Sequence, residues 1–145
     1  MSHYQLMNES QIKDKLSSFQ CPVDKGYPKL VTPLTYYTRV DGDEVLAYSS
    51  FSDLGSFYFV GNTYVLPKNR GQGIYGDLLT NRNNHLNDKP KITIVNPIEG
   101  TDIDILHRQV AKQGGVKINL YIQVADFMSK ELYMELRDLP IYFYR

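Results

Sequence analysis

The amino-acid sequence predicts a mixed α/β fold, with a mostly antiparallel central sheet of about six or seven strands flanked by helices. Some segments alternate apolar and polar residues with a period of two, whereas others repeat apolar residues at helical spacing. The chain has 145 residues, of which 42% are hydrophobic, and a chain of this size can bury one core. We therefore expect a single domain over residues 1–145.

Two stretches of the N-terminal half carry clear local signals. Asn8 followed by Gln11 fits a capping box, in which the two side chains bond each other's backbone amides at the start of a helix. Gly42 lies between two segments rich in β-branched and aromatic residues, 35–40 and 44–51. A glycine in a tight turn between such segments indicates a hairpin.

The remaining elements follow from periodicity and punctuation. Residues 56–66 predict a long strand, in which Gly61 marks a bulge or a close backbone approach. Residues 74–86 have helical spacing, with Ile74, Leu78, Leu79, Arg82 and Leu86 on one face. Further strands are predicted at 3–7, 91–95, 116–124 and 141–144, and further helices at 101–113 and 126–137.

Composition argues against several classes of partner. Lysine plus arginine and aspartate plus glutamate each number 16, so the chain lacks the basic excess of a nucleic-acid-binding protein. Residues 1–10 lack the apolar run of a secretory signal, and no apolar stretch is long enough to cross a bilayer. We expect a soluble cytoplasmic protein with neither a nucleic acid nor a membrane as partner.

Cysteine and histidine content argues against a metal centre. Cys21 is the only cysteine, which excludes an internal disulfide and a multi-thiolate metal site. His3, His85 and His107 share no metal-ligand spacing with one another or with acidic residues. No metal is predicted.

The stretch RGQGIYG contains Gly71, Gly73 and Gly76 in the dinucleotide-binding spacing G-x-G-x-x-G. A dinucleotide site needs a buried strand that runs straight into the first glycine and an acidic residue at the end of the next strand. Here residues 67–70 separate the strand from Gly71, and the next strand ends without an acid. The sequence therefore argues against a dinucleotide site.

The wider stretch YVLPKNRGQGIYGDLL, residues 64–79, resembles motif A of the GNAT family of acyl-CoA-dependent N-acyltransferases. The family pattern V-x-P-x-x-R-G-x-G is matched by Val65, Pro67, Arg70, Gly71 and Gly73. The resemblance implies a GNAT-like fold and an N-acetyltransferase that uses acetyl-CoA as co-substrate.

By this resemblance the glycine loop holds the pyrophosphate of coenzyme A. Backbone amides that converge at a helix N-terminus favour an anion in any protein, and the helix dipole adds to the effect. The family has a small residue at position 75, so the Tyr75 side chain must turn away from the phosphates. The alternative is that the glycines only shape a tight turn. The implied donors are the amides of Gly71, Gln72, Gly73, Ile74 and Tyr75, with Arg70 nearby as the cation.

In the family, the strand before the loop and the strand after the helix splay apart, and the pantetheine arm of coenzyme A lies between them. The resemblance implies the same splay here between strands 56–66 and 91–95. The implied coenzyme contacts are the amide of Val65, the carbonyl of Tyr64 or Leu66, and Asn96 in the turn after the second strand.

The family's catalytic base is not matched on the expected strand. Many GNAT enzymes place a glutamate there, but residues 57–65 contain no carboxylate. Tyr64 or Asn62 could hold a relaying water, or Glu44 or Asp53 could approach from the neighbouring strand and turn.

The family's acid for the departing thiolate is a tyrosine on the helix after the fifth strand. The predicted helix 101–113 has no tyrosine, and His107 occupies roughly the corresponding place. An imidazole suits proton transfer near neutral pH, and the alternative is an ordinary helix histidine.

The acceptor and the assembly state have weaker signals. Tyrosine rings can line an amine site by cation–π attraction or simply pack against the sheet. Strand 141–144 could pair with a second copy through an open edge, which leaves a homodimer open. The tyrosines predicted to border the acceptor side are Tyr27, Tyr36, Tyr37, Tyr48 and Tyr58.

Two functions follow from these residues. The first is an N-acetyltransferase in which a primary amine of a small molecule or peptide attacks acetyl-CoA directly. The second is a catalytically degenerate GNAT-like protein that serves as an acyl-CoA-binding or interaction module. The intact segment 70–73 favours the first, and the missing base favours the second.

Overall fold

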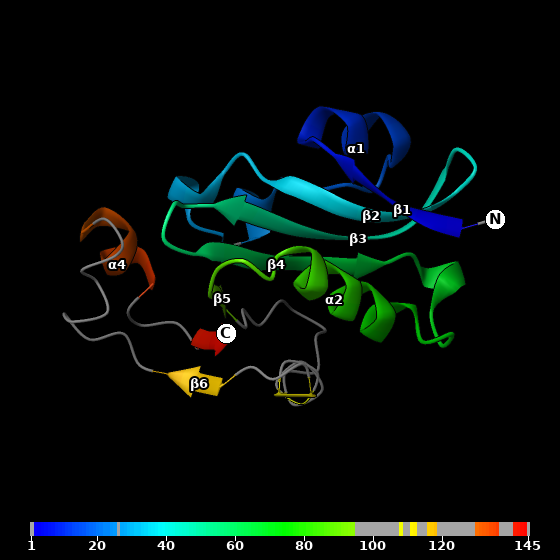
Figure 1. Cartoon of the computed structure of the whole chain (residues 1–145). Coiled ribbons are helices and arrows are strands. Elements are labelled where there is room, and N and C mark those ends of the chain that lie inside the picture. Colours follow the sequence, from blue (N-terminus) through cyan, green and yellow to red (C-terminus); the bar gives the residue numbers. More distant parts are fainter. Residues whose placement is uncertain are drawn as a thin grey trace.

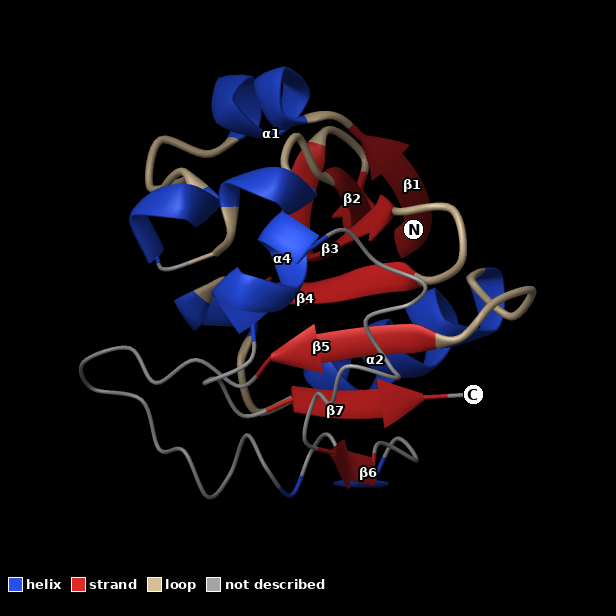
Figure 2. Ribbon diagram, turned by 90° about the vertical axis from the view of Figure 1, so that its left-hand side faces the viewer, coloured by secondary structure: helices blue, strands red, loops and turns tan. Residues whose placement is uncertain are grey.

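The computed structural model describes residues 2–25, 27–94, 108, 111–112, 116–118, 130–136 and 141–144. Among these residues, seven strands form one sheet in the order β1-β2-β3-β4-β5-β7-β6. Figure 2 shows β1 and β2 near the top and β3, β4, β5, β7 and β6 below them in turn. Only β4 and β5 run parallel; the other neighbours are antiparallel. The predicted mixed, mostly antiparallel sheet is confirmed. The strands are β1 (Ser2–Met7), β2 (Thr35–Asp41), β3 (Glu44–Asp53), β4 (Tyr58–Val65), β5 (Lys91–Ile94), β6 (Val116–Ile118) and β7 (Ile141–Tyr144).

Helices cover both faces of the sheet. The helices α1 (Glu9–Lys15) and α2 (Ile74–His85) lie on opposite sides of the strands in Figure 1, and α4 (Lys130–Leu136) packs in the same cluster as α1. Among the residues that the structure describes, no helix is long and apolar enough to cross a membrane. Short 3₁₀ turns are η1 (Pro22–Lys25), η2 (Lys29–Val31) and η3 (Pro67–Asn69).

The local signals of the sequence produce the expected elements. Asn8 and Gln11 form the predicted capping box, with bonds of 2.8 and 2.9 Å in the two directions. Gly42 has φ 60° in the turn between β2 and β3, which confirms the hairpin. On α2, the apolar residues and Arg82 of the predicted face are all buried, as is Leu86 just beyond the helix.

Separate apolar clusters lie on the two faces of the sheet. The α1 side contains Ile12, Tyr36 and Phe59, all fully buried. The α2 side contains Ala47 and Leu78, also fully buried. Burial of a large apolar side chain contributes about 1.5–3 kcal/mol, so these clusters hold the helices on the sheet.

A bulge interrupts β4. Phe59 and Tyr64 pack on the same face although they are five positions apart, a spacing that places two residues of a regular strand on opposite faces. In the pairing with β3, Tyr48 lies opposite Tyr64 and Ser50 lies opposite Gly61. A step of two residues on β3 thus matches a step of three on β4, so β4 contains one extra residue. The bulge expected at Gly61 is confirmed.

The strands β4 and β5 separate soon after they meet. Their pairing is confined to Tyr58↔Lys91 and Phe59↔Ile92, whereas β4 continues to Val65. The splay predicted between these two strands is therefore present, and the bulge of β4 lies at its narrow end.

The sequence suggests that two copies pair through an open edge at residues 141–144, and this open edge is wrong. In the described sheet, β7 lies between β5 and β6 and bonds to both. Its backbone groups are satisfied within the chain, so it offers no open edge. The described edge strands are β1 and β6.

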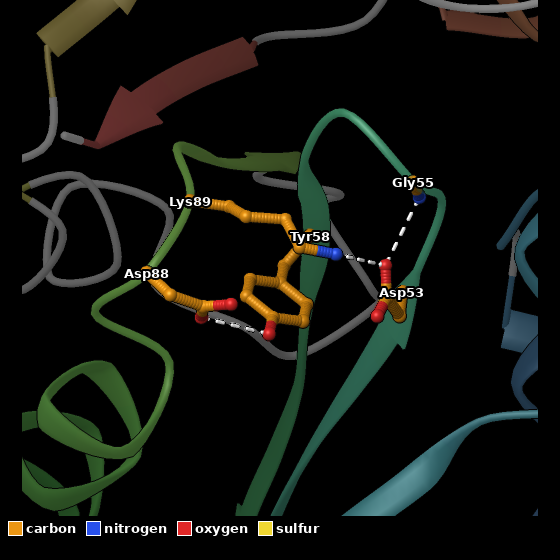
Figure 3. A network of polar contacts seen from close by, with 5 residues as sticks. All are labelled: Asp53, Gly55, Tyr58, Asp88 and Lys89. Atoms are coloured by element: carbon orange, nitrogen blue, oxygen red, sulfur yellow. Dashed lines mark hydrogen bonds and ion pairs between the residues drawn. The ribbon is translucent and has the colours of Figure 1, made fainter.

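A polar network ties the end of β3 to the connection between α2 and β5 (Figure 3). Lys89 Nζ lies 2.6 Å from Asp53 Oδ1, which also accepts from the Gly55 amide at 3.0 Å. The Tyr58 hydroxyl donates to Asp88 at 2.9 Å, and Lys89 lies over the Tyr58 ring. The hydrogen bond from Lys89, followed by that from Gly55, lowers the pKa of Asp53.

Asp53→Asn is expected to reduce the loss of unfolding free energy that the protein undergoes as the pH falls. Because the folded-state pKa of Asp53 lies below its ordinary 3.8, its ionised form stabilises the fold above that pH. The stabilisation is lost as the pH falls through the lower, folded-state pKa. Urea unfolding at about pH 5 and about pH 2.5 measures the difference. Asp14→Asn, on the exposed side of α1, is the control; equal acid sensitivity of Asp53→Asn and the wild type would contradict the expectation.

Candidate functional site

The glycine loop leads from β4 into α2 through two left-handed residues. Gly71 has φ 79° and Gly73, the N-cap of α2, has φ 76°. Nothing lies within 4 Å of a Cβ added at either residue, so backbone conformation rather than space requires glycine there. The residues from Arg70 to Gly73 are exposed, and no side chain caps α2. The first amides of α2 therefore face open space at the positive end of the helix dipole.

Tyr75 and Gly76 also fit the GNAT interpretation of the loop. The Tyr75 side chain packs against the buried cluster between α2 and the sheet, which includes Val65 and Leu78, and burial raises its pKa. It therefore turns away from the open side of the loop, as expected. Gly76 lies within α2, without positive φ and with free space around it, so this position does not require glycine.

Arg70 points back toward β4. Its Nε donates to the Val65 carbonyl at 2.9 Å, and its guanidinium lies 5.3 Å from the centre of the Tyr64 ring. Lys68 pairs with Glu44. In this arrangement Arg70 fixes the end of β4 to the loop, while the amides of α2 provide the positive potential on the open side.

The backbone of Val65 faces the splay. The Leu66 amide donates to Leu46 on β3 at 3.1 Å, and the Leu66 carbonyl accepts from Asn69 at 2.8 Å. Because successive backbone groups of a strand alternate direction, the groups of Val65 point away from β3, and those of Tyr64 point toward it. Of Tyr64, Val65 and Leu66, Val65 is therefore the residue whose amide points to the gap between β4 and β5.

Polar side chains gather on the α1 side of the bulge. Asn62 has φ 49°, and its side-chain nitrogen is buried without a hydrogen-bond partner in the described structure, as is the Tyr36 hydroxyl. The Asn62 side chain lies close enough to Tyr36 to lower the tyrosine's pKa, although burial raises that pKa more strongly. Burial also raises the pKa of Tyr48 to about 12, so these hydroxyls stay neutral at physiological pH.

Tyr27 reaches this group from the segment between α1 and β2, and Glu9 acts on it electrostatically from α1. The Asn62 backbone amide hydrogen-bonds the Tyr27 hydroxyl, while burial raises the pKa of Tyr27. After burial, the next cause that raises the pKa of Tyr36 is the charge of the Glu9 carboxylate, in the first turn of α1. Glu9 is not among the residues that the sequence predicts at the site, because the capping box predicts the helix start but not its direction relative to β4.

Arg82 supports the bulge from the α2 side. Its side chain is 2% exposed, and Nη1 donates to the Ser49 hydroxyl at 2.8 Å. Ser49 in turn bonds Thr63 at 2.7 Å, and Ser50 donates to the Gly61 carbonyl at 2.8 Å. A buried cation on α2 thereby holds the irregular part of β4 in place through β3.

The structure keeps the two alternative carboxylates away from the bulge. Glu44 lies at the start of β3 and pairs with Lys68, and Asp53 lies at the end of β3 and pairs with Lys89. His107 and Asn96 lie outside the described residues.

The predicted tyrosine set divides between the two faces. Tyr27, Tyr36 and Tyr48 pack on the α1 side, together with Tyr64. Tyr37 and Tyr58 belong to the clusters on the α2 side, so those two do not border the same cleft. The physical reason is the alternation of a strand, which places neighbours such as Tyr36 and Tyr37 on opposite faces.

Comparisons with solved structures match this architecture. An acyl-CoA N-acyltransferase from Pseudomonas aeruginosa aligns over 100% of both chains with a TM-score of 0.60 at 12% identity. A GNAT-family acetyltransferase from Staphylococcus aureus Mu50 aligns over 99% of this chain and 98% of its own, with a TM-score of 0.57 at 11% identity. The chain has the GNAT fold.

A third neighbour was solved with a ligand. The Bacillus subtilis N-acetyltransferase YlbP, in complex with coenzyme A, aligns over 100% of this chain and 97% of its own, with a TM-score of 0.57 at 13% identity. No protein-family model matches the sequence, and a comparison with curated proteins finds no significant match. The likeness is therefore one of fold, and it agrees with the resemblance that motif A indicates.

Proposed function

We propose that the protein is an N-acetyltransferase that transfers an acetyl group from acetyl-CoA to a primary amine of a small molecule or peptide. The observation that carries the proposal is the left-handed pair Gly71 and Gly73 at an uncapped helix N-terminus, beside two diverging parallel strands. A diphosphate suits the amides of such a loop. The cytoplasmic location stays a prediction.

The coenzyme is proposed to lie along the splay. The amides of Gly71 through Tyr75 would bind the pyrophosphate, and the Val65 amide would bind the pantetheine arm. Arg70 would act mainly by fixing the end of β4, since its Nε is bonded to Val65. Asn96, two positions along the sequence from the end of β5, completes the proposed set.

Acetyl-CoA supplies an activated acetyl group, so the chain must orient the amine and remove its proton. Asn62 and Tyr64 are proposed to hold the water that takes this proton. Glu9, whose charge reaches Tyr36 beside Asn62, is proposed as the carboxylate that favours the transfer. His107 is proposed as the proton donor to the departing thiolate.

The second candidate is a protein that binds acyl-CoA without turnover. It is favoured by the absence of a carboxylate on β4 and by the pairing of Glu44 and Asp53 with lysines. A thiol-release assay with polyamines, aminoglycosides, amino acids and peptide N-termini separates the two. Turnover with one amine class supports the enzyme; coenzyme binding without turnover of any amine supports the module. Turnover that His107→Phe leaves unchanged would remove His107 from the mechanism.

Glu9→Gln is expected to lower kcat by about tenfold or more with little change in acetyl-CoA affinity, because an acid–base group contributes to turnover rather than to coenzyme binding. Asp14→Asn is the matched control, since Asp14 lies on the same helix and is exposed. Initial rates with the best amine measure the effect. An unchanged kcat in Glu9→Gln would exclude Glu9 from the proton transfer.

A further inference from the structure

We propose that Tyr27 closes the narrow end of the splay and restricts the acyl donor to short chains such as acetyl. The inference rests on the proposed function and adds the class of acyl group that the site accepts.

Tyr27 reaches β4 from the segment between α1 and β2. Its side chain is 9% exposed, and its ring packs edge-on against Phe59, with the ring centres 5.8 Å apart at 83°. Phe59 is the last β4 residue that pairs with β5. The Tyr27 ring therefore lies over the point at which the two strands begin to separate.

The Tyr27 hydroxyl fills the space beside Gly61. A Cβ added at Gly61 would lie 1.9 Å from Tyr27 Oη and 3.3 Å from Thr93 Oγ1. Gly61 is on β4 just past the paired residues, and Thr93 is on β5 directly after Ile92. The hydroxyl thus occupies the gap between the two strands, and glycine at position 61 allows it to enter.

This position sets a limit on the length of a bound chain. The phosphate loop follows the C-terminal end of β4, so a coenzyme held there extends along the splay toward the bulge. An acyl chain longer than acetyl would continue toward Gly61 and meet the Tyr27 side chain. Burial keeps that side chain neutral by raising its pKa, and the Asn62 amide hydrogen-bonds it in place.

The test is equilibrium binding of coenzyme A, acetyl-CoA and hexanoyl-CoA, measured by calorimetry on the wild type and Tyr27→Ala. Tyr37→Ala is the control, because Tyr37 packs on the opposite face. We expect the wild type to bind acetyl-CoA roughly tenfold or more tightly than hexanoyl-CoA. In Tyr27→Ala the two affinities should agree within roughly threefold, and Tyr37→Ala should keep the wild-type ratio. If Tyr27→Ala does not fold, Tyr27→Leu, which keeps apolar contact with Phe59, carries the same comparison.

The outcomes separate this inference from the proposed function. If the wild type binds acetyl-CoA and hexanoyl-CoA equally, or if Tyr27 variants keep the wild-type ratio, the role of Tyr27 is overturned while coenzyme binding stands. If coenzyme A and both thioesters fail to bind the wild type, the proposed function is overturned, and the inference with it.

Discussion

Gly73→Asp is expected to abolish the stabilisation of the protein by acetyl-CoA. A ligand at about 100 times its dissociation constant stabilises the folded state by about 2.7 kcal/mol, which corresponds to a rise in Tm of roughly 5–10 °C for a chain of this size. An aspartate at the N-cap of α2 places a carboxylate against the bound phosphates and cancels part of the positive potential of the helix end. Differential scanning fluorimetry with and without millimolar acetyl-CoA measures the effect.

Matched variants separate charge from backbone strain. In Gly73→Asn, the asparagine must adopt the same positive φ as the aspartate of Gly73→Asp and has nearly the same shape, but it carries no charge. This variant should keep most of the rise in Tm. Gly76→Ala and Cys21→Ala should keep all of it. Equal loss in Gly73→Asn and Gly73→Asp would show that conformation rather than charge is responsible, and no rise in the wild type would remove coenzyme binding altogether.

Arg82→Ala is expected to lower the free energy of unfolding by about 3 kcal/mol, or roughly 6–12 °C in Tm. The guanidinium is buried and bonds Ser49 and Asn83, so its removal leaves buried polar groups unpaired and opens space behind the bulge. Urea unfolding without ligand measures the loss. A loss below about 1 kcal/mol would contradict the supporting role of Arg82.

Two further variants make the test of Arg82 specific. Asn84→Ala, at an exposed position of α2, should be neutral or slightly stabilising. Ser49→Ala should cost about 1 kcal/mol alone and much less in the Arg82→Ala background, because the two side chains share a hydrogen bond. Additive losses would mean that Arg82 and Ser49 act independently.

Local chemistry explains which parts of the fold the sequence predicts. The Asn8–Gln11 box, the Gly42 hairpin and the helical stripe that includes Arg82 depend on neighbouring residues, and each is present in the structure. The order of strands depends on long-range pairing, for which the sequence has no local signal. For that reason the edge position expected of residues 141–144 is wrong, while their strand conformation is right.

The candidate site shows the same division. The positive φ of Gly71 and Gly73 is a local requirement that motif A expresses directly. The direction of Arg70 is decided by the Val65 carbonyl and the Tyr64 ring, which only the folded turn brings together. The approach of Tyr27 to Gly61 joins distant segments, and a glycine inside a strand is its one sequence signal.

Amide chemical shifts on titration with coenzyme A test the central claim most directly, namely that the loop from Gly71 to Tyr75 binds the pyrophosphate and Val65 binds the pantetheine arm. In ¹H–¹⁵N spectra, coenzyme A should shift the amides of Gly71, Gly73, Ile74 and Val65. Pantetheine, which lacks the phosphates, should shift Val65 and leave the loop unchanged. Loop amides that stay in place with saturating coenzyme A, or that respond equally to pantetheine, would contradict the assignment.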